Sequence, residues 1–494
     1  MKKVRLVYIF IVIYLAIFLT LSIMKHNSFN STGADLGEYD QQVWGLSKGE
    51  LIYDTTVGFR TFSAHFNPIL ILIAPFYWIY SNPITLLVLQ TIALSFGALG
   101  VYLIAKLKLK NENASLILSA AYLLNPSVHY INLFDFHPIA FAIPFILFAF
   151  YFMEKRQYTK SIIFLVLLAM TKEHLPVYMA TFGAYMFLLH KKRKMGAILA
   201  VIGVLWFIFG IFISPYLFSG GTHGFFYFQK YLTPIWEKIA FLILLTAPVG
   251  FLALFSPQIL LLGIVEFGII LIQKRTYTEI IYQHQGSVIS LVFIAAIYSI
   301  SLILKNQDII KKKIRLLKKI NLKLALPFIV LISTSLCYIA YGPFTVLYDL
   351  EEFNTNTQYV KTGNKFVEMI PKEASVSTNN WVIPHISQRY EIYKFPKPLY
   401  EIYYGLEYSQ PDYVLLDMSE AIIDPKRSGR ALKDEHFNLI FNDKNYGITK
   451  VEGTWVLLKK GENYEKNICE ITPFLNKQKY PYLNLEIENT KKCR

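Results

Sequence analysis

The chain has 494 residues and a formal net charge of +15, and 54% of its residues are hydrophobic while only 17% are charged. This composition excludes an ordinary water-soluble protein, in which about a quarter of the residues are charged. The positive charge lies in short clusters between apolar runs, so it indicates membrane topology and not a nucleic-acid-binding surface. We therefore expect a polytopic α-helical membrane protein that binds no nucleic acid.

The N-terminal apolar segment, residues 5–25, follows a basic start and is long enough to cross a bilayer. It carries no small-residue cleavage site, so we expect a retained span and not a cleaved signal peptide. A run that contains a proline, 67–80, is too short for a span and predicts an interfacial or re-entrant helix. The apolar runs predict about eleven spans, near 5–25, 83–105, 114–129, 138–153, 158–172, 174–190, 196–215, 236–255, 257–273, 286–304 and 324–342.

The basic clusters between these runs predict the orientation of the chain. Lys2, Lys3 and Arg5 place the N-terminus in the cytoplasm. Alternation of the spans then puts four further clusters on the cytoplasmic side, at 106–110, 154–160, 190–194 and 311–319. One basic cluster, 273–277, falls outside. We expect residues 1–343 to form the transmembrane domain.

The composition changes after the last predicted span. Residues 344–494 contain a helical pattern at 357–371 and strand-like runs such as "DYVLLDM" and "TWVLLKKG". These patterns predict a soluble extracytoplasmic α/β domain. Cys469 and Cys493 could form a disulfide there, although their spacing alone does not establish one.

The first outer loop, 26–82, carries a group of acidic residues. Asp35, Glu38 and Asp40 lie within six residues of one another, and a helical turn would place Asp35 and Glu38 on one face. Ionisable groups close to the hydrocarbon are energetically costly and tend to be functional, so we expect at least one of the three to be catalytic. Alternatively, Asp35 caps a surface helix whose N-terminal dipole the other two acids favour.

A second candidate group lies in "NLFDFHP", between two predicted spans. Asp135 and His137 are two residues apart, and a carboxylate and an imidazole could together bind a divalent cation such as Mg²⁺ or Mn²⁺. The imidazole could equally bind a phosphate. An Asx-type turn made by Asp135 before Pro138 would explain the same residues without a ligand.

Charged residues interrupt apolar sequence again in "TKEHLP", residues 171–176. Lys172 or His174 could hold a phosphate while Glu173 orients a partner. The alternative is that Lys172 extends to the membrane interface with Glu173 as its counter-ion. His65, in "AHFNP", adds a further polar residue on the same predicted face.

Two more outer segments contain candidate substrate-binding residues. His223 lies in the glycine- and aromatic-rich stretch 219–231, which suits sugar stacking or a gate over a lipid groove. Arg275 and His284 lie in a basic stretch that suits an anionic headgroup. Interfacial anchoring would explain both stretches as well.

With these residues in place, the sequence resembles domain-of-unknown-function family 2079, a prokaryotic family of predicted multipass membrane proteins. The resemblance rests on an ordered set of motifs: "ADLGEYDQQVW", "AHFNPILILIAPFY", "NLFDFHP", "TKEHLPVY", "VIPHISQRYEIYKFP" and "DYVLLD". This family in turn resembles the GT-C glycosyltransferases, which move sugars from polyprenyl-phosphate donors on the non-cytoplasmic face. The resemblance implies a GT-C-like fold, and it maps an essential acid of the first outer loop onto Asp35, with Asp40 as the next candidate.

We therefore predict an inverting glycosyltransferase that uses a polyprenyl-phosphate-linked sugar and a glycan, lipid or protein acceptor. Asp35 would act as general base, and the substrate-binding candidates are His65, Lys172, Glu173, His174, His223, Arg275 and His284. We expect the acids and imidazoles to converge at the outer face. Two alternatives remain: a transporter or flippase of a lipid-linked or anionic substrate, which would use paired halves not detected here, and a non-catalytic membrane anchor.

Overall fold

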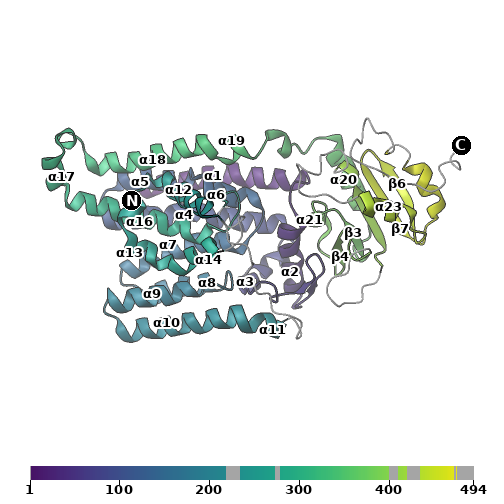
Figure 1. Cartoon of the computed structure of the whole chain (residues 1–494), viewed down its shortest axis with the longest axis horizontal. Coiled ribbons are helices and arrows are strands. Elements are labelled where there is room, and N and C mark those ends of the chain that lie inside the picture. Colours follow the sequence, from purple (N-terminus) through teal and green to yellow (C-terminus); the bar gives the residue numbers. More distant parts are fainter. Residues whose placement is uncertain are drawn as a thin grey trace. The chain divides into compact units, whose positions relative to one another are not determined.

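The structure is a computed structural model that describes residues 2–218, 234–272, 279–399, 410–419, 434–471 and 474. The chain divides into two compact units. Unit 1 comprises Met1–Ile23 and Arg60–Glu352, and unit 2 comprises Met24–Phe59 and Phe353–Arg494. Each unit is described by itself. Figure 1 labels the helices and strands of both.

Unit 1 is built from apolar helices. Within the described residues, five helices are long and apolar enough to cross a membrane: Lys3–Asn27, Ile84–Leu109, Arg193–Phe218, Gly286–Lys305 and Leu322–Val346. They contain α1 (Lys2–Asn27), α4 (Ile84–Leu109), α10 (Arg193–Ile208), α16 (Gly286–Lys305) and α18 (Leu322–Tyr341). The chain is therefore a helical membrane protein, and the total of eleven spans stays a prediction.

Shorter helices occupy several of the other predicted spans. They are α7 (Ala142–Glu154), α8 (Tyr158–Ala169), α9 (Val177–Leu188), α12 (Ile235–Thr246), α13 (Pro257–Leu260) and α14 (Ile264–Ile272). The apolar run at 67–80 forms a short helix, Ile69–Trp78, as predicted from its length and proline. Because α8 ends at Ala169 and α9 begins at Val177, residues 171–176 form a turn outside both helices.

The predicted span at 114–129 is broken into two helices, α5 (Glu112–Leu123) and α6 (Pro126–Phe134). The Asn125 side chain accepts a hydrogen bond from the Ser127 backbone N–H, and Pro126 occupies the first turn of α6. Asparagine at an N-cap and proline at the first helical position both favour the start of a new helix. The break thus has a local cause that hydropathy does not detect.

Helices α9 and α10 lie side by side (Figure 1) because glycines line their contact. A Cβ added at Gly196 would lie 2.6 Å from the Gly183 carbonyl oxygen, and one at Gly203 would lie 2.6 Å from the Ala180 nitrogen. Gly196 and Gly203 are seven residues apart and so share a face of α10. Small residues of this kind let membrane helices approach backbone to backbone.

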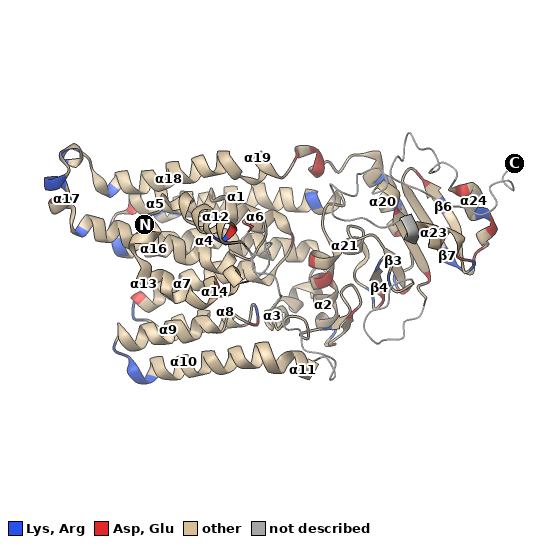
Figure 2. Ribbon diagram, in the orientation of Figure 1, with Lys and Arg blue, Asp and Glu red and all other residues tan. Residues whose placement is uncertain are grey.

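Basic residues gather at one end of unit 1. Figure 2 shows them where α9 joins α10 and around α17 (Gln307–Lys313). The structure therefore agrees with the prediction that the clusters at 190–194 and 311–319 share a side. The assignment of that side to the cytoplasm stays a prediction.

Unit 2 contains a five-stranded mixed sheet with the strand order β4-β3-β5-β7-β6. The strands are β3 (Val376–Thr378), β4 (Ile392–Lys394), β5 (Tyr413–Asp417), β6 (Tyr446–Glu452) and β7 (Trp455–Lys460). The central strand β5 pairs parallel with β3 and antiparallel with β7.

Each face of this sheet is covered by a helix. Val414 and Leu416 pack with residues of α23 (Asp434–Asn442), whereas Leu415 packs with Phe366 of α20 (Gln358–Glu368). This alternation is the two-residue period of a strand that is buried on both faces. A small α/β domain is therefore present. Cys469 of this unit is disulfide-bonded, and Cys493 lies outside the described residues.

The first part of the predicted outer loop belongs to unit 2. It forms a π-helical turn, Gly33–Gly37, followed by α2 (Glu38–Ser47) and the short strand β1 (Tyr53–Asp54). A Cβ at Gly33 or Gly37 would lie 2.6 or 2.7 Å from the Ile383 side chain, so this turn packs closely on α21 (Ile383–Ile386). The two units divide the predicted outer loop, 26–82, between Phe59 and Arg60.

Candidate functional site

The turn between α8 and α9 is held by backbone contacts from two other segments of unit 1. The Ile69 N–H donates to the Met170 carbonyl oxygen at 2.9 Å, which brings the segment containing His65 to this turn. A Cβ at Gly210 would lie 2.8 Å from the Glu173 carbonyl oxygen, so the C-terminal part of the long helix Arg193–Phe218 packs directly on Glu173. The turn is therefore positioned by close backbone packing.

Two glutamate–histidine pairs lie at this turn. His65 Nδ1 is 3.1 Å from Glu173 Oε1, and the two side chains are 21% and 15% exposed. His174 Nε2 is 3.2 Å from Oε1 of Glu266, which is buried within α14. Glu173 Oε1 also lies 3.8 Å from His174 Nδ1, so His174 contacts both carboxylates.

The ion pairs change the pKa values of their members. Burial alone would raise the pKa of Glu173, but the charge of His65 and hydrogen bonds from His174 and His65 lower it well below its usual range. Burial likewise opposes a charge on His174, but Glu266 and Glu173 raise the pKa of its imidazole to about 9. A carboxyl group with so low a pKa accepts protons poorly, so Glu173 fits an orienting role better than that of general base.

Three further groups of unit 1, His284, Lys172 and His137, interact electrostatically with members of these two ion pairs or with one another. Burial, together with the positive charges of Lys172, His137, His174 and His65, lowers the pKa of His284 well below its ordinary value. Each of these groups must lie near His284 for its charge to act there. We name the set His65, His137, Lys172, Glu173, His174, Glu266 and His284 the histidine–glutamate cluster.

Aromatic side chains pack beside the cluster. The Phe134 ring lies 5.5 Å from the His137 ring and 5.4 Å from the Tyr282 ring, measured between centroids. The Tyr282 ring in turn lies 6.3 Å from that of His284. The cluster thus combines cationic groups with an aromatic border.

Gln90 fixes the turn that carries Asp135 and His137. Its Nε2 donates to the Asp135 carbonyl oxygen at 2.8 Å, and its Oε1 accepts from the His137 backbone N–H at 2.8 Å. Gln90 is fully buried in α4. Asp135 and His137 are also buried, and within the described residues no group of three or more His, Cys, Asp and Glu side chains could hold a metal ion. Metal binding by this pair stays a prediction without structural support.

The three candidate acids of the first outer loop, Asp35, Glu38 and Asp40, lie in unit 2. Asp40 is fully buried and accepts hydrogen bonds from Ser387 Oγ at 2.6 Å and from Gln388 Nε2 at 3.1 Å. Asp35 is half-buried, and the Thr32 hydroxyl donates to its Oδ2 at 2.8 Å. Asp40 thus fastens the loop to the sheet domain, whereas Asp35 is the more accessible of these two.

Glu38 belongs to a second buried network in unit 2. Gln42 Nε2 donates to Glu38 Oε1 at 3.2 Å and to Asp54 Oδ2 at 2.9 Å. Burial raises the pKa of Asp54 to about 6, although the hydrogen bonds from Thr56 and Gln42 oppose this shift. A carboxyl group that titrates so close to neutrality was not expected from the sequence.

The structure brings together five predicted substrate-binding residues, His65, Lys172, Glu173, His174 and His284, and it adds His137. Asp135, next to His137 in sequence, is held at the same turn by Gln90. His223 and Arg275 lie outside the described residues. Glu266 and Gln90 were missed, although each is a polar residue within a predicted apolar span, and that is the signal that could have identified them.

Comparison with known proteins supports a family and a fold. The family described as "Predicted membrane protein (DUF2079)" matches residues 25–450. No curated protein matches the chain. ArnT from Cupriavidus metallidurans bound to undecaprenyl phosphate is similar in structure, with a TM-score of 0.58 and 11% identity over 92% of this chain and 97% of that chain.

Two further solved structures are similar over the same share of this chain. ArnT in the apo state has a TM-score of 0.55, 11% identity and 97% coverage of that chain. The archaeal oligosaccharyltransferase AglB from Archaeoglobus fulgidus, in complex with an inhibitory peptide and a dolichol-phosphate, has a TM-score of 0.39, 14% identity and 74% coverage of that chain. At the identity found with ArnT, the likeness shows the fold alone, which is that of the GT-C glycosyltransferases.

Proposed function

Since the chain belongs to the DUF2079 family of predicted membrane proteins and has a GT-C fold, we propose that it is a membrane glycosyltransferase. It would move a sugar from a polyprenyl-phosphate-linked donor to a glycan, lipid or protein acceptor on the extracytoplasmic face. The observation that carries the proposal is the histidine–glutamate cluster, in a fold shared with a protein solved with undecaprenyl phosphate bound.

The cluster suits a lipid-linked phosphate. Lys172 supplies a positive charge, and His174, whose pKa is raised to about 9, is protonated at neutral pH. His284 is neutral there because its pKa is lowered, so it can donate one N–H without adding charge. Charged and neutral hydrogen-bond donors that are preorganised in the site stabilise the negative charge that develops on a leaving phosphate.

Asp35 is our candidate for the general base. The acceptor oxygen would form the new bond to the anomeric carbon as the bond from that carbon to the phosphate oxygen breaks. The acceptor proton would pass to Asp35, and the polyprenyl phosphate would leave with the electron pair. A single displacement of this kind inverts the anomeric centre. We favour Asp35 over Asp40 and Glu38 because both of these are buried.

Binding of the lipid phosphate can be measured without knowing the sugar. We expect purified protein to bind undecaprenyl phosphate and Lys172→Gln to weaken this binding about 10- to 100-fold, the effect of losing one charged hydrogen bond. Lys305→Gln is the matched control, because Lys305 is exposed and ends the 20-residue helix α16 that begins beside His284. Equal affinity of Lys172→Gln and wild type would contradict the proposed phosphate site.

Catalysis requires a separate measurement. Mass spectrometry of membrane glycolipids and surface glycans should show a glycosylated product that is lost when the gene is deleted and returns with the wild-type chain. Substrate uptake into vesicles without a covalent product would instead support a transporter.

A further inference from the structure

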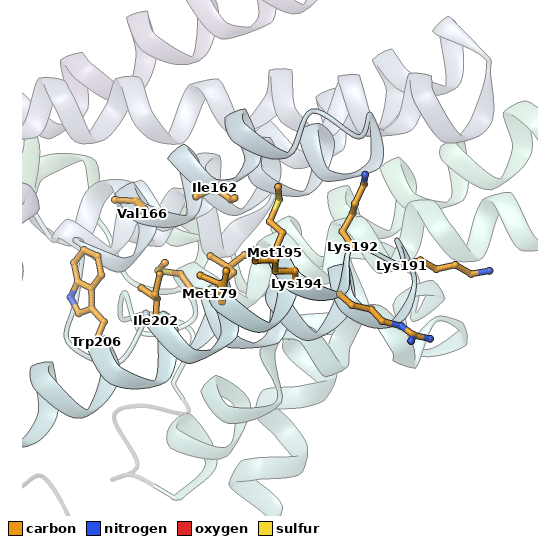
Figure 3. A pocket seen from close by; sticks show the side chains of 12 residues that line it. Ile162, Val166, Met179, Lys191, Lys192, Lys194, Met195, Ile202 and Trp206 are labelled. Atoms are coloured by element: carbon orange, nitrogen blue, oxygen red, sulfur yellow. The ribbon is translucent and has the colours of Figure 1, made fainter.

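A groove in unit 1 lies on α8, α9 and α10 (Figure 3). Its volume is about 620 Å³, within the range of about 300–1,000 Å³ found for small-molecule sites. The apolar part is lined by side chains that include Ile162 and Val166 of α8, Met179 of α9, and Ile202 and Trp206 of α10. In Figure 3, Val166 and Trp206 lie at one end of the groove and Lys191 and Lys192 at the other.

The polar end of the groove is entirely basic among the described lining residues. Four consecutive residues, Lys191, Lys192, Arg193 and Lys194, contribute to it, and all four are exposed. Lys192 Nζ lies 5.8 Å from the ring centroid of Tyr158, the first residue of α8. The preference for Lys and Arg in cytoplasmic loops would explain the positive charge of this loop. It would not explain the apolar groove that adjoins the charge.

The basic end of the groove and the cluster are at opposite ends of α9, whereas the apolar end reaches Met179 in the first turn of α9. The basic loop follows α9, whereas the turn with Glu173 and His174 precedes it. Because α9 has 12 residues, these ends are about 18 Å apart. The proposed donor phosphate and the basic loop therefore belong to different depths of the membrane.

We propose that this groove binds an anionic glycerophospholipid, with its phosphate on the basic loop and an acyl chain along the apolar part. The occupant follows from charge complementarity, because a row of four cations adjoining an apolar groove matches a molecule with a negative head and a hydrocarbon tail. Basic pockets between membrane helices recognise anionic headgroups in this way. The inference is independent of the proposed glycosyl transfer.

Native mass spectrometry of the purified full-length protein tests this site. The probes are dioleoyl phosphatidylglycerol and dioleoyl phosphatidylcholine in equal amounts, which differ in headgroup charge and share their acyl chains. We expect the wild type to retain phosphatidylglycerol at least about fivefold better, the effect of a single basic residue near a charged headgroup. Equal retention of the two lipids would overturn the proposal.

Two pairs of variants test whether the preference for phosphatidylglycerol over phosphatidylcholine arises at this groove. Neutralising the loop (K191Q/K192Q/R193Q/K194Q) should abolish it, whereas K311Q/K312Q/K313Q, in the basic helix α17, should not. Ile202→Trp should displace the retained lipid by filling the groove with all charges in place, whereas Val201→Trp, at a neighbouring exposed position outside the lining, should not.

If K191Q/K192Q/R193Q/K194Q fails to insert into the membrane, the comparison of Ile202→Trp with Val201→Trp still tests the site, because both variants keep every charge. Equal retention by Ile202→Trp and Val201→Trp would overturn the site. Displacement of phosphatidylglycerol by undecaprenyl phosphate would also overturn it, by assigning the groove to a polyprenyl tail.

Discussion

His65 Nδ1 lies 3.1 Å from Glu173 Oε1, across 108 residues of sequence. Through this pair, the loop that precedes the short helix Ile69–Trp78 is joined to the turn between α8 and α9. His174 extends the same arrangement to Glu266, whose Oε1 also accepts a hydrogen bond from Ser287 Oγ at 2.9 Å. Four segments of unit 1 therefore meet at two carboxylates.

Loss of the Glu173 charge should destabilise unit 1. We expect Glu173→Gln to lower the free energy of unfolding by about 1.5–3 kcal/mol, because it removes hydrogen bonds to a charged, largely buried group. The control is Glu112→Gln, which breaks an exposed pair with Lys106 and should have a much smaller effect, because solvent screens that pair. Thermal unfolding of both variants in the same detergent makes the comparison, and equal effects would contradict the assigned role.

Protonation of His174 should make stability depend on pH. Its pKa is raised from 6.5 to about 9, so the folded state binds the proton more tightly than the unfolded state. The resulting stabilisation is complete below about pH 6.5 and is lost as the pH rises through about 9. In His174→Gln, the thermal midpoint should change less between pH 6.5 and 9.5 than in wild type; parallel profiles would exclude His174 as the titrating group.

Asp54 should make the stability of unit 2 depend on pH, in this case because the folded state favours the neutral form of the side chain. Its pKa is raised from 3.8 to about 6, so the folded state binds the proton more tightly than the unfolded state does. Its contribution is complete below about pH 4 and is lost as the pH rises through about 6, with an upper limit of about 3 kcal/mol. Asp54→Asn should flatten this loss, measured as the rate of proteolysis near residue 54 at pH 5 and pH 7.5. A variant with an unchanged pH profile would show that another group titrates.

The glycine contact between α9 and α10 should not tolerate a methyl group. A Cβ at Gly203 would lie 2.6 Å from the Ala180 nitrogen, so Gly203→Ala should separate the helices and reduce the yield of folded protein in size-exclusion chromatography. Gly268→Ala is the matched control, because no described atom lies within 4 Å of a Cβ there. It should be neutral or stabilising by up to about 1 kcal/mol. Normal yield from Gly203→Ala would show that the contact can relax.

Substitution of Asp35 and of Asp40 in the first outer loop should have different effects, one on activity and the other on stability. Asp35→Asn should keep the folded yield of the wild type and abolish the glycosylated product. Asp40→Asn should destabilise unit 2 by about 1–3 kcal/mol, because its Asn side chain cannot accept hydrogen bonds at both positions that Ser387 and Gln388 occupy. Wild-type turnover by Asp35→Asn would refute its assignment as general base.

The candidate site was partly predictable from sequence because its charged members interrupt apolar runs. Lys172, Glu173 and His174 stand out in "TKEHLP" for this reason. The role of Glu266 was not predictable in this way, since a single acid within an apolar run does not indicate which residue it pairs with. Gln90 is a similar case, because its side chain contacts a turn more than 40 residues away.

The sequence by itself determined the class of this protein and the family to which it belongs. Apolar length decides whether a segment is stable in lipid, and that is a property of a local run of residues. Only the tertiary structure decided that Asp40 fastens the first loop to the sheet domain, and that His174 bridges Glu173 and Glu266. These pairs depend on how separate helices and strands pack, because a carboxylate takes its pKa and its role from partners that can be hundreds of residues away in sequence.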